Sequence, residues 1–143
     1  MLLIACSSNA VKGACSDDFS GKFLVRDWSG ELPKTGFLER YKKGSGFRAA
    51  EDRLDEGLIT EKVVSESGKP YLRVYFQTRE ILTTKADYRL VLDNRLEFRI
   101  SEIVATGSGA WGCPLESARV NECQANANAV ISFDRKCGSP VQK

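Results

Sequence analysis

The feature that most constrains the fold is a run of alternating apolar and polar residues between Asp87 and Val104. Successive side chains of a β-strand point to opposite faces, so apolar residues two positions apart share a face. The run contains two such sets, which are Tyr88, Leu90 and Leu92, followed by Leu96, Phe98 and Ile100. This pattern predicts an antiparallel hairpin with one face in the core.

The register of the predicted hairpin follows from its turn. A two-residue loop would place Leu92 opposite Arg95 and set a charge on the apolar face. Pairing Leu92 with Leu96 avoids this conflict, and it requires the three-residue connection 93–95, normally a type I turn followed by a bulge. We therefore expect these pairs across the hairpin: Leu92 with Leu96, Leu90 with Phe98, and Tyr88 with Ile100.

The opposite face of the same hairpin is mostly charged. It carries Arg89, Glu97, Arg99 and Ser101 beside a single apolar residue, Val91. Charges of mixed sign can pair across neighbouring strands. We expect this face to be solvated, and a partner surface is the alternative interpretation.

Further strands are predicted at 21–28, 58–65 and 71–77, where apolar and β-branched residues are bounded by turn residues. The segment 71–77 has the clearest alternation of the three. One face carries Leu72, Val74 and Phe76, and the other carries Tyr71, Arg73, Tyr75 and Gln77. A half-buried antiparallel strand is therefore expected here.

Two short helices are predicted between the first of these strands and the second. Thr35 can cap a turn through Phe37, Leu38 and Tyr41, because these apolar residues recur near the helical period. A second helix is expected over 47–55, with Gly57 as its C-terminal stop.

The end of the chain predicts a last hairpin, made by segments 117–123 and 129–136 across the loop 124–128. Taken together, these elements predict an α+β fold. We expect a single small domain, mainly an antiparallel β-sheet with one or two short helices, stabilised by disulfides.

Composition narrows the function. The chain has 143 residues, of which 42% are hydrophobic and 28% charged, as in one small folded domain. Its formal net charge is only +2, so no nucleic-acid partner is expected. It contains no histidine, which removes the commonest metal ligand and the side chain most used for acid–base catalysis. We expect no metal site, no cofactor and no catalytic residues.

The start of the chain carries a recognisable motif. Leu3-Ile4-Ala5-Cys6 resembles the lipobox of lipoproteins from Gram-negative bacteria, in which aliphatic and small residues precede a cysteine that becomes lipid-modified. By this resemblance Cys6 is the lipidated residue, and acyl chains hold the protein on a bilayer. Ser7 follows it, where the family's signal for inner-membrane retention is aspartate. The resemblance implies an outer-membrane lipoprotein that faces the periplasm.

The lipobox also divides the chain. Residues 1–6 would be the remnant of a signal peptide that begins upstream of Met1, since an export signal needs about 7–15 apolar residues. Residues 7–20 lack apolar periodicity and are expected to form a flexible tether. Residues 21–143 would then form the globular periplasmic domain.

The chain has five cysteines, so one remains after pairs are formed. Assigning Cys6 to lipidation leaves Cys15, Cys113, Cys123 and Cys137, with no Cys-x-x-Cys pair among them. Two disulfides are expected in an oxidising compartment, and four cysteines allow three connectivities. The expected last hairpin favours Cys113 with Cys137 and Cys15 with Cys123.

Two segments are candidate binding sites. The loop from Gly107 to Gly112 contains Gly109 and Trp111, an arrangement that permits close approach of a ligand to an aromatic anchor. The alternative is that Trp111 covers the disulfide at Cys113. The second candidate is the strand face of Tyr71, Arg73 and Tyr75, for which a solvated face is the alternative.

These observations favour a non-catalytic lipoprotein that is anchored through Cys6 and binds a protein partner in the envelope. An inhibitor, an immunity factor or an envelope-assembly factor would fit. The alternative is a glycan- or lipid-binding module that uses Trp111 and its loop. A hydrolase is the third possibility, since carboxylates alone can catalyse hydrolysis.

Overall fold

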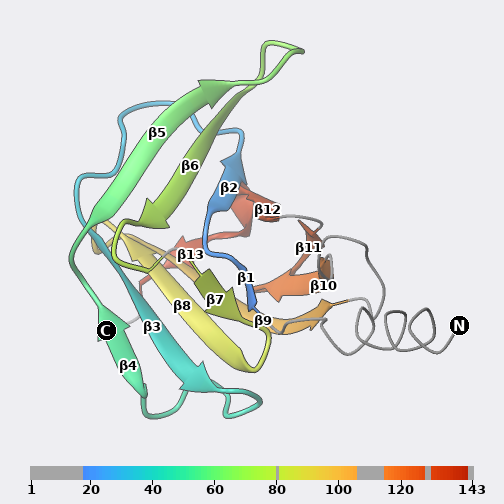
Figure 1. Cartoon of the computed structure of the whole chain (residues 1–143). Coiled ribbons are helices and arrows are strands. Elements are labelled where there is room, and N and C mark those ends of the chain that lie inside the picture. The colour runs from blue at the N-terminus through green and yellow to red at the C-terminus, as the bar shows by residue number, and fades with distance from the viewer. Residues whose placement is uncertain (1–17, 80, 106–114, 128–129, 142–143) are drawn as a thin grey trace, which may run out of the picture.

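The computed structural model describes residues 18–79, 81–105, 115–127 and 130–141 (Figure 1). The strands are β1 (Asp18–Ser20), β2 (Phe23–Arg26), β3 (Gly36–Lys42), β4 (Asp52–Leu54), β5 (Leu58–Val64), β6 (Pro70–Phe76), β7 (Ile81–Thr83), β8 (Ala86–Leu92), β9 (Leu96–Ala105), β10 (Leu115–Val120), β11 (Cys123–Ala127), β12 (Ile131–Asp134) and β13 (Ser139–Pro140). A short 3-10 helix, η1 (Arg135–Cys137), follows β12. These described residues contain no α-helix, so the predicted α+β class is wrong and the fold is all β.

The strands form one large curled sheet, a half-barrel, and one small ribbon (Figure 1). The large sheet has the order β4-β3-β8-β9-β10-β11-β12-β2-β6-β5, and β13 also pairs with β9. Strands β1 and β7 form the ribbon. The β12–β2 pair is parallel, whereas the other ladders are antiparallel. The sheet therefore has a meander from β8 to β12, with the β3–β4 hairpin beside β8 and, beyond the parallel β12–β2 pair, the β5–β6 hairpin.

The core is one cluster that draws on both halves of the sheet. Phe133 of β12 lies at its centre, with its ring centroid 4.8 Å from that of Phe98 and 6.4 Å from that of Phe23. All three rings are at most 1% exposed. Full burial of a large apolar side chain contributes about 1.5–3 kcal/mol, so this cluster stabilises the curl.

The register predicted for the hairpin between β8 and β9 is confirmed. Leu92 lies opposite Leu96, Leu90 opposite Phe98, and Tyr88 opposite Ile100. The turn differs from the expected type, because Asp93 and Asn94 take left-handed φ angles of 53° each. Asp and Asn tolerate this region best among residues other than glycine.

The first predicted helix is instead β3. Phe37, Leu38 and Tyr41 are all buried, but on both faces of a strand. Leu38 joins the core, whereas Phe37 lies on the outer face under the guanidinium of Arg53, 3.7 Å from its ring centroid. Because apolar residues occupy both faces, their spacing imitated the helical period.

The second predicted helix, over 47–55, is a loop followed by β4. Phe47 and Ala49 have φ angles of 63° and 52°, which a right-handed helix does not allow. The ring of Phe47 packs edge-on against Tyr41, 5.3 Å between centroids. Strand β4 then pairs with β3, setting Leu54 opposite Leu38. Tertiary pairing outweighs the local periodicity.

The hairpin predicted from segments 117–123 and 129–136 was also wrong. Two hairpins occupy this region: β10 pairs with β11 through a tight turn at Asn121 and Glu122, with Val120 opposite Cys123, and β11 pairs with β12. This turn brings Cys123 to Cys137, and the two form a disulfide with a Cα–Cα distance of 5.8 Å. The expected bridges, Cys113 with Cys137 and Cys15 with Cys123, are therefore both wrong, although a disulfide and both of its cysteines were correctly expected.

Two further expectations are modified. The end of the expected tether, Asp18–Ser20, forms β1, where Phe19 is only 8% exposed and joins the core. The charged face of the β8–β9 hairpin is not solvated throughout, because Glu97 and Val91 are each 1% exposed. Cross-strand arginines and the aromatic rings of β3 cover this face.

Candidate functional site

Strand β6 presents the three residues singled out by its alternation on one outer face. Leu72, Val74 and Phe76 point into the core, so Tyr71, Arg73 and Tyr75 point away from it, and each is partly exposed. The sequence alternation predicted this separation. The outer face of β6 is the middle of a larger surface, because β5 and β2 flank it.

The flanking strands add apolar residues to that surface. Ile59 of β5 lies opposite Tyr75, and Val63 lies opposite Tyr71. Leu24 of β2 lies opposite Arg73 on the other side. We name this surface the tyrosine face, defined by Leu24, Ile59, Val63, Tyr71, Arg73 and Tyr75. It consists of side chains that are neither buried nor fully exposed.

Polar contacts hold the tyrosine face in place. Glu61 lies opposite Arg73, with its Oε2 3.5 Å from Arg73 Nη1, and its Oε1 accepts a 3.2 Å hydrogen bond from the hydroxyl of Tyr75. The ammonium group of Lys22 lies 5.2 Å from the ring centroid of Tyr75, within cation–π range. The charges of Glu61, Arg73 and Lys22 are therefore paired or stacked, and Glu61 and Lys22 hold the Tyr75 ring.

A hollow of about 350 Å³ adjoins the tyrosine face at Tyr71. Across it, Arg26 Nε donates a 2.9 Å hydrogen bond to Asp134, and Arg26 Nη1 donates to Ser132 Oγ at 3.0 Å. This hydrogen bond from Arg26 lowers the pKa of Asp134 despite some burial, so the carboxylate stays ionised. Lys69 lies on the rim.

Sequence reasoning missed the partners of the tyrosines. Ile59, Val63 and Leu24 were assigned to strands, but nothing in the sequence said which strands would be neighbours of β6. The signal available for Ile59 and Val63 was their own period of two within β5, interrupted by Glu61. Leu24 carried no such signal, because its pairing depends on a contact between distant segments.

The other sequence candidates lie outside the described residues. These are Cys6, Cys15, Gly109, Trp111 and Cys113. Within the residues that are described, no three His, Cys, Asp or Glu side chains gather in a way that could hold a metal ion. In the same residues, no helix is long and apolar enough to cross a membrane.

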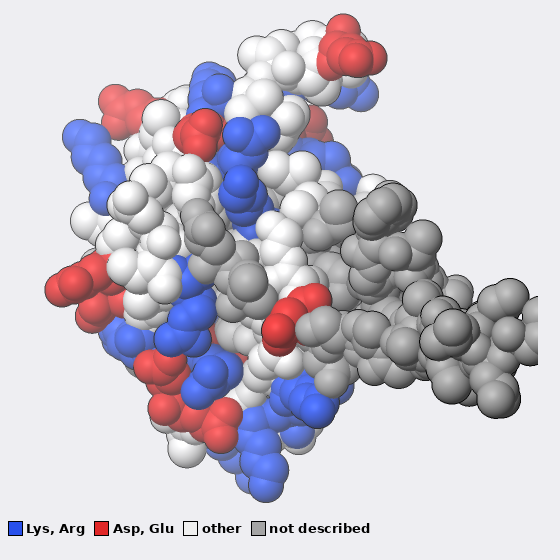
Figure 2. Space-filling view, viewed as in Figure 1, with Lys and Arg blue, Asp and Glu red and all other residues white. Residues whose placement is uncertain are grey.

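Charge is mixed over the molecular surface. Figure 2 shows basic and acidic side chains interspersed across one face, and the tip that projects beyond the body carries both signs. The surfaces seen in this view therefore differ in their specific side-chain contacts and not in an electrostatic field of one sign.

No protein-family model matches the chain, and neither a curated protein nor a solved structure matches it. Its function must therefore be inferred from the chain's own residues and their geometry.

Proposed function

We propose that this protein is a membrane-anchored periplasmic lipoprotein, without catalytic activity, that binds a protein partner through the tyrosine face. The observation that carries the proposal is the grouping of Tyr71, Arg73 and Tyr75 with three apolar side chains on one strand-built surface. Tyrosine and arginine are enriched among the residues that dominate protein–protein interfaces.

The structure of the face suits a protein better than a small ligand. Three neighbouring strands supply it, so its residues are displayed on a continuous sheet surface. Tyr75 is held through Glu61, which reduces the side-chain entropy lost on binding. Arg73 keeps a side chain that is 34% exposed, so it can contact a partner at the centre of the face.

The compartment is supported by two features. The lipobox ending at Cys6 resembles that of exported lipoproteins. The disulfide between Cys123 and Cys137 is the kind of bond that persists in oxidising compartments. Together they favour the periplasm.

The test is retention of a partner from envelope extracts in mild detergent. Wild-type protein should retain a distinct protein, and the double variant Tyr71→Ala/Tyr75→Ala should lose it. Val104→Ala serves as the matched control, because Val104 is 43% exposed on β9 and lies outside the tyrosine face. Equal retention by wild type and the double variant would overturn the proposal.

Truncating two half-buried rings could also weaken the fold. The substitution Arg73→Gln avoids this problem, because it removes no core contact and sets no like charge opposite Glu61. It should abolish retention while the thermal unfolding temperature stays within a few degrees of the wild type. Retention that survives Arg73→Gln in a folded protein would also contradict the proposal.

A further inference from the structure

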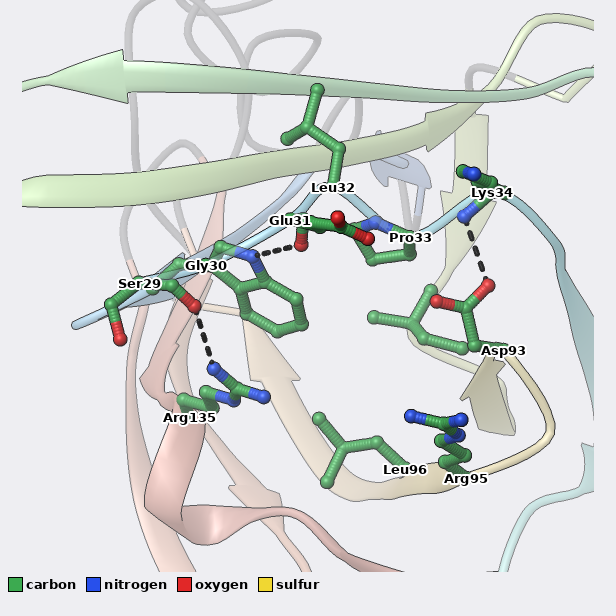
Figure 3. A pocket seen from close by; sticks show the side chains of 12 residues that line it. Ser29, Gly30, Glu31, Leu32, Pro33, Lys34, Asp93, Arg95, Leu96 and Arg135 are labelled. Atoms are coloured by element: carbon green, nitrogen blue, oxygen red, sulfur yellow. Dashed lines mark hydrogen bonds between the residues drawn. The ribbon is translucent and has the colours of Figure 1, made fainter.

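A second cavity, of about 510 Å³, lies between the segment 28–34, the turn from β8 to β9, and η1 (Figure 3). Small-molecule sites typically measure about 300–1,000 Å³, so its size suits a compact ligand. No residue of the tyrosine face lines it. It is therefore a separate candidate site.

One wall of this cleft is fixed by Trp28. Its ring is 4% exposed, and its Nε1 donates a 3.1 Å hydrogen bond to the carbonyl oxygen of Glu31. The guanidinium of Arg135 lies 4.3 Å from the Trp28 ring centroid and donates from Nη1 to the carbonyl oxygen of Ser29 at 2.9 Å. The wall is thus preorganised, which lowers the entropy cost of binding.

The opposite wall is fixed by Asp93. Its Oδ1 accepts hydrogen bonds from the backbone N–H groups of Lys34 and Thr35, at 2.9 and 3.0 Å, and lies 3.3 Å from the Thr35 hydroxyl. Partial burial opposes ionisation, but these hydrogen bonds outweigh it and lower the pKa of Asp93, with a smaller effect from Arg95. The Asp93 carboxylate is therefore hydrogen-bonded to the backbone of the segment that leads into β3.

The basic side chains of the cleft have fewer hydrogen-bond partners than Asp93. Arg135 uses one terminal nitrogen on Ser29 and keeps other donors. Among the described residues, the side chains of Lys34 and Arg95 make no hydrogen bond and no ion pair within 4.0 Å. The lining holds three basic residues and two acidic ones, and one of those acids, Asp93, is already hydrogen-bonded three times.

Apolar side chains line the same cavity beside these cations. Leu92 and Leu96 flank the turn that carries Arg95, and both line the cavity together with Trp28. Figure 3 shows Leu96 between the guanidinium groups of Arg95 and Arg135. A ligand here would meet positive charge and an apolar wall together.

We infer that this cleft binds a small amphiphilic anion: a carboxylate or phosphate monoester carried on a short apolar chain. The anionic head contacts Lys34, Arg95 and Arg135, because guanidinium groups bind both oxyanions through paired N–H donors. The apolar chain lies on Leu96, whose side chain is partly exposed in the lining. This site is independent of the tyrosine face.

The test uses hexanoate, hexyl phosphate and the neutral analogue hexanol, with binding measured by calorimetry. Emission from Trp28 gives a second readout in the Trp111→Phe protein, whose remaining tryptophan lines the cleft. At least one anion should bind and change this emission, whereas hexanol should bind at least tenfold more weakly. A preference for hexanoate would identify a carboxylate ligand, and a preference for hexyl phosphate a phosphate ligand.

Two variants and two controls complete the design. Lys34→Ala and Arg95→Ala should each weaken anion binding about tenfold, since each removes a charge-assisted contact. Lys62→Ala, which removes an exposed charge on β5, and Tyr71→Ala/Tyr75→Ala should leave it unchanged. The inference is overturned if neither anion binds at concentrations up to about 10 mM, because a dissociation constant above that value is weaker than those of specific small-ligand sites. It is also overturned if hexanol binds equally well or both cleft variants bind like the wild type.

Discussion

Arg89 and Arg99 lie directly opposite each other on β8 and β9, and the carboxylate of Glu97 joins them. Arg89 Nε donates a 2.6 Å hydrogen bond to Glu97 Oε1, and Arg99 Nε lies 2.8 Å from Glu97 Oε2. Like charges opposed across strands are destabilising. Glu97, whose side chain is 2% exposed, offsets that repulsion from within the sheet.

The pairing continues across β3. Arg89 Nη1 donates to Glu39 at 2.7 Å, and the hydroxyl of Tyr41 donates to the same oxygen at 2.7 Å. Burial alone would raise the pKa of Glu39, but these hydrogen bonds outweigh it and lower that pKa. The result is a chain of alternating charges across three strands.

Glu97→Gln should destabilise the protein by about 3 kcal/mol, because it leaves two opposed arginines without their shared carboxylate. Urea unfolding followed by circular dichroism measures this loss. The matched control is Glu61→Gln, which removes an ion pair on an exposed strand face and should cost less than about 1 kcal/mol. Equal losses in the two variants would contradict the role assigned to Glu97.

Asn121 occupies the point where β9 changes partner from β13 to β10. Its Nδ2 donates to the carbonyl oxygens of Glu97 and Cys137 at 3.0 and 2.7 Å, and its Oδ1 accepts from the N–H of Arg99 at 2.9 Å. Its φ angle of 52° is left-handed. The Asn121 side chain therefore supplies the hydrogen bonds that a neighbouring strand would otherwise make with these backbone groups.

Asn121→Ala should cost about 2–4 kcal/mol, because it removes these hydrogen bonds and strains a left-handed position. Asn121→Gly should cost less, since glycine adopts that φ without strain. The difference between their unfolding free energies, about 1 kcal/mol, isolates the backbone contribution. An alanine variant as stable as the glycine variant would show that φ strain is absent.

The disulfide between Cys123 and Cys137 closes a separation of 14 residues, which corresponds to about 3 kcal/mol in the loop-entropy model. In a Cys15→Ser/Cys113→Ser background, reduction should lower the unfolding temperature. Non-reducing peptide mapping should find Cys123 linked to Cys137. A Cys113–Cys137 peptide from the wild type would contradict the structure.

Stability should fall in acid partly through Asp93. Its pKa is lowered in the folded protein, so its contribution is present above the unfolded value near 3.8 and is lost as pH falls through the lower folded value. Asp93→Asn can keep hydrogen-bond acceptance without the titration. The difference in unfolding free energy between the wild type and Asp93→Asn should therefore narrow as the pH falls from 6 into the acid range. A difference that stays constant would refute the role assigned to Asp93.

Lipidation should depend on Cys6. In cells that express the gene with its upstream sequence, labelling with an alkyne fatty acid should mark the wild type, and Cys6→Ser should abolish the label. Unaltered labelling of Cys6→Ser would exclude the lipobox assignment. Cys123→Ser serves as the control for a cysteine outside the lipobox.

Strict alternation was the most reliable sequence signal. It predicted the β8–β9 register and the two faces of β6, because each strand has one clearly apolar face. It failed at β3, where Phe37 under Arg53 and Tyr41 against Phe47 are both buried on the face opposite Leu38. Covered outer faces break the alternation on which the prediction depends.

The candidate sites show the same limit. Tyr71, Arg73 and Tyr75 share one strand, so local sequence places them together. The cleft combines Trp28, Asp93 and Arg135, which are far apart in the chain and meet only through the curl of the sheet. No local pattern encodes such a meeting, because it depends on strand order.

The parallel pairing of β2 with β12 also predicts an order of events during folding. It joins residues as far apart as Arg26 and Asp134, 108 positions, whereas β5–β6, β8–β9 and β10–β11 are hairpins between neighbours. Contacts between distant segments form slowly, since long loops must close first. We therefore expect the hairpins to form early, and the shared core to be completed when β12 brings Phe133 against Phe98 and Phe23.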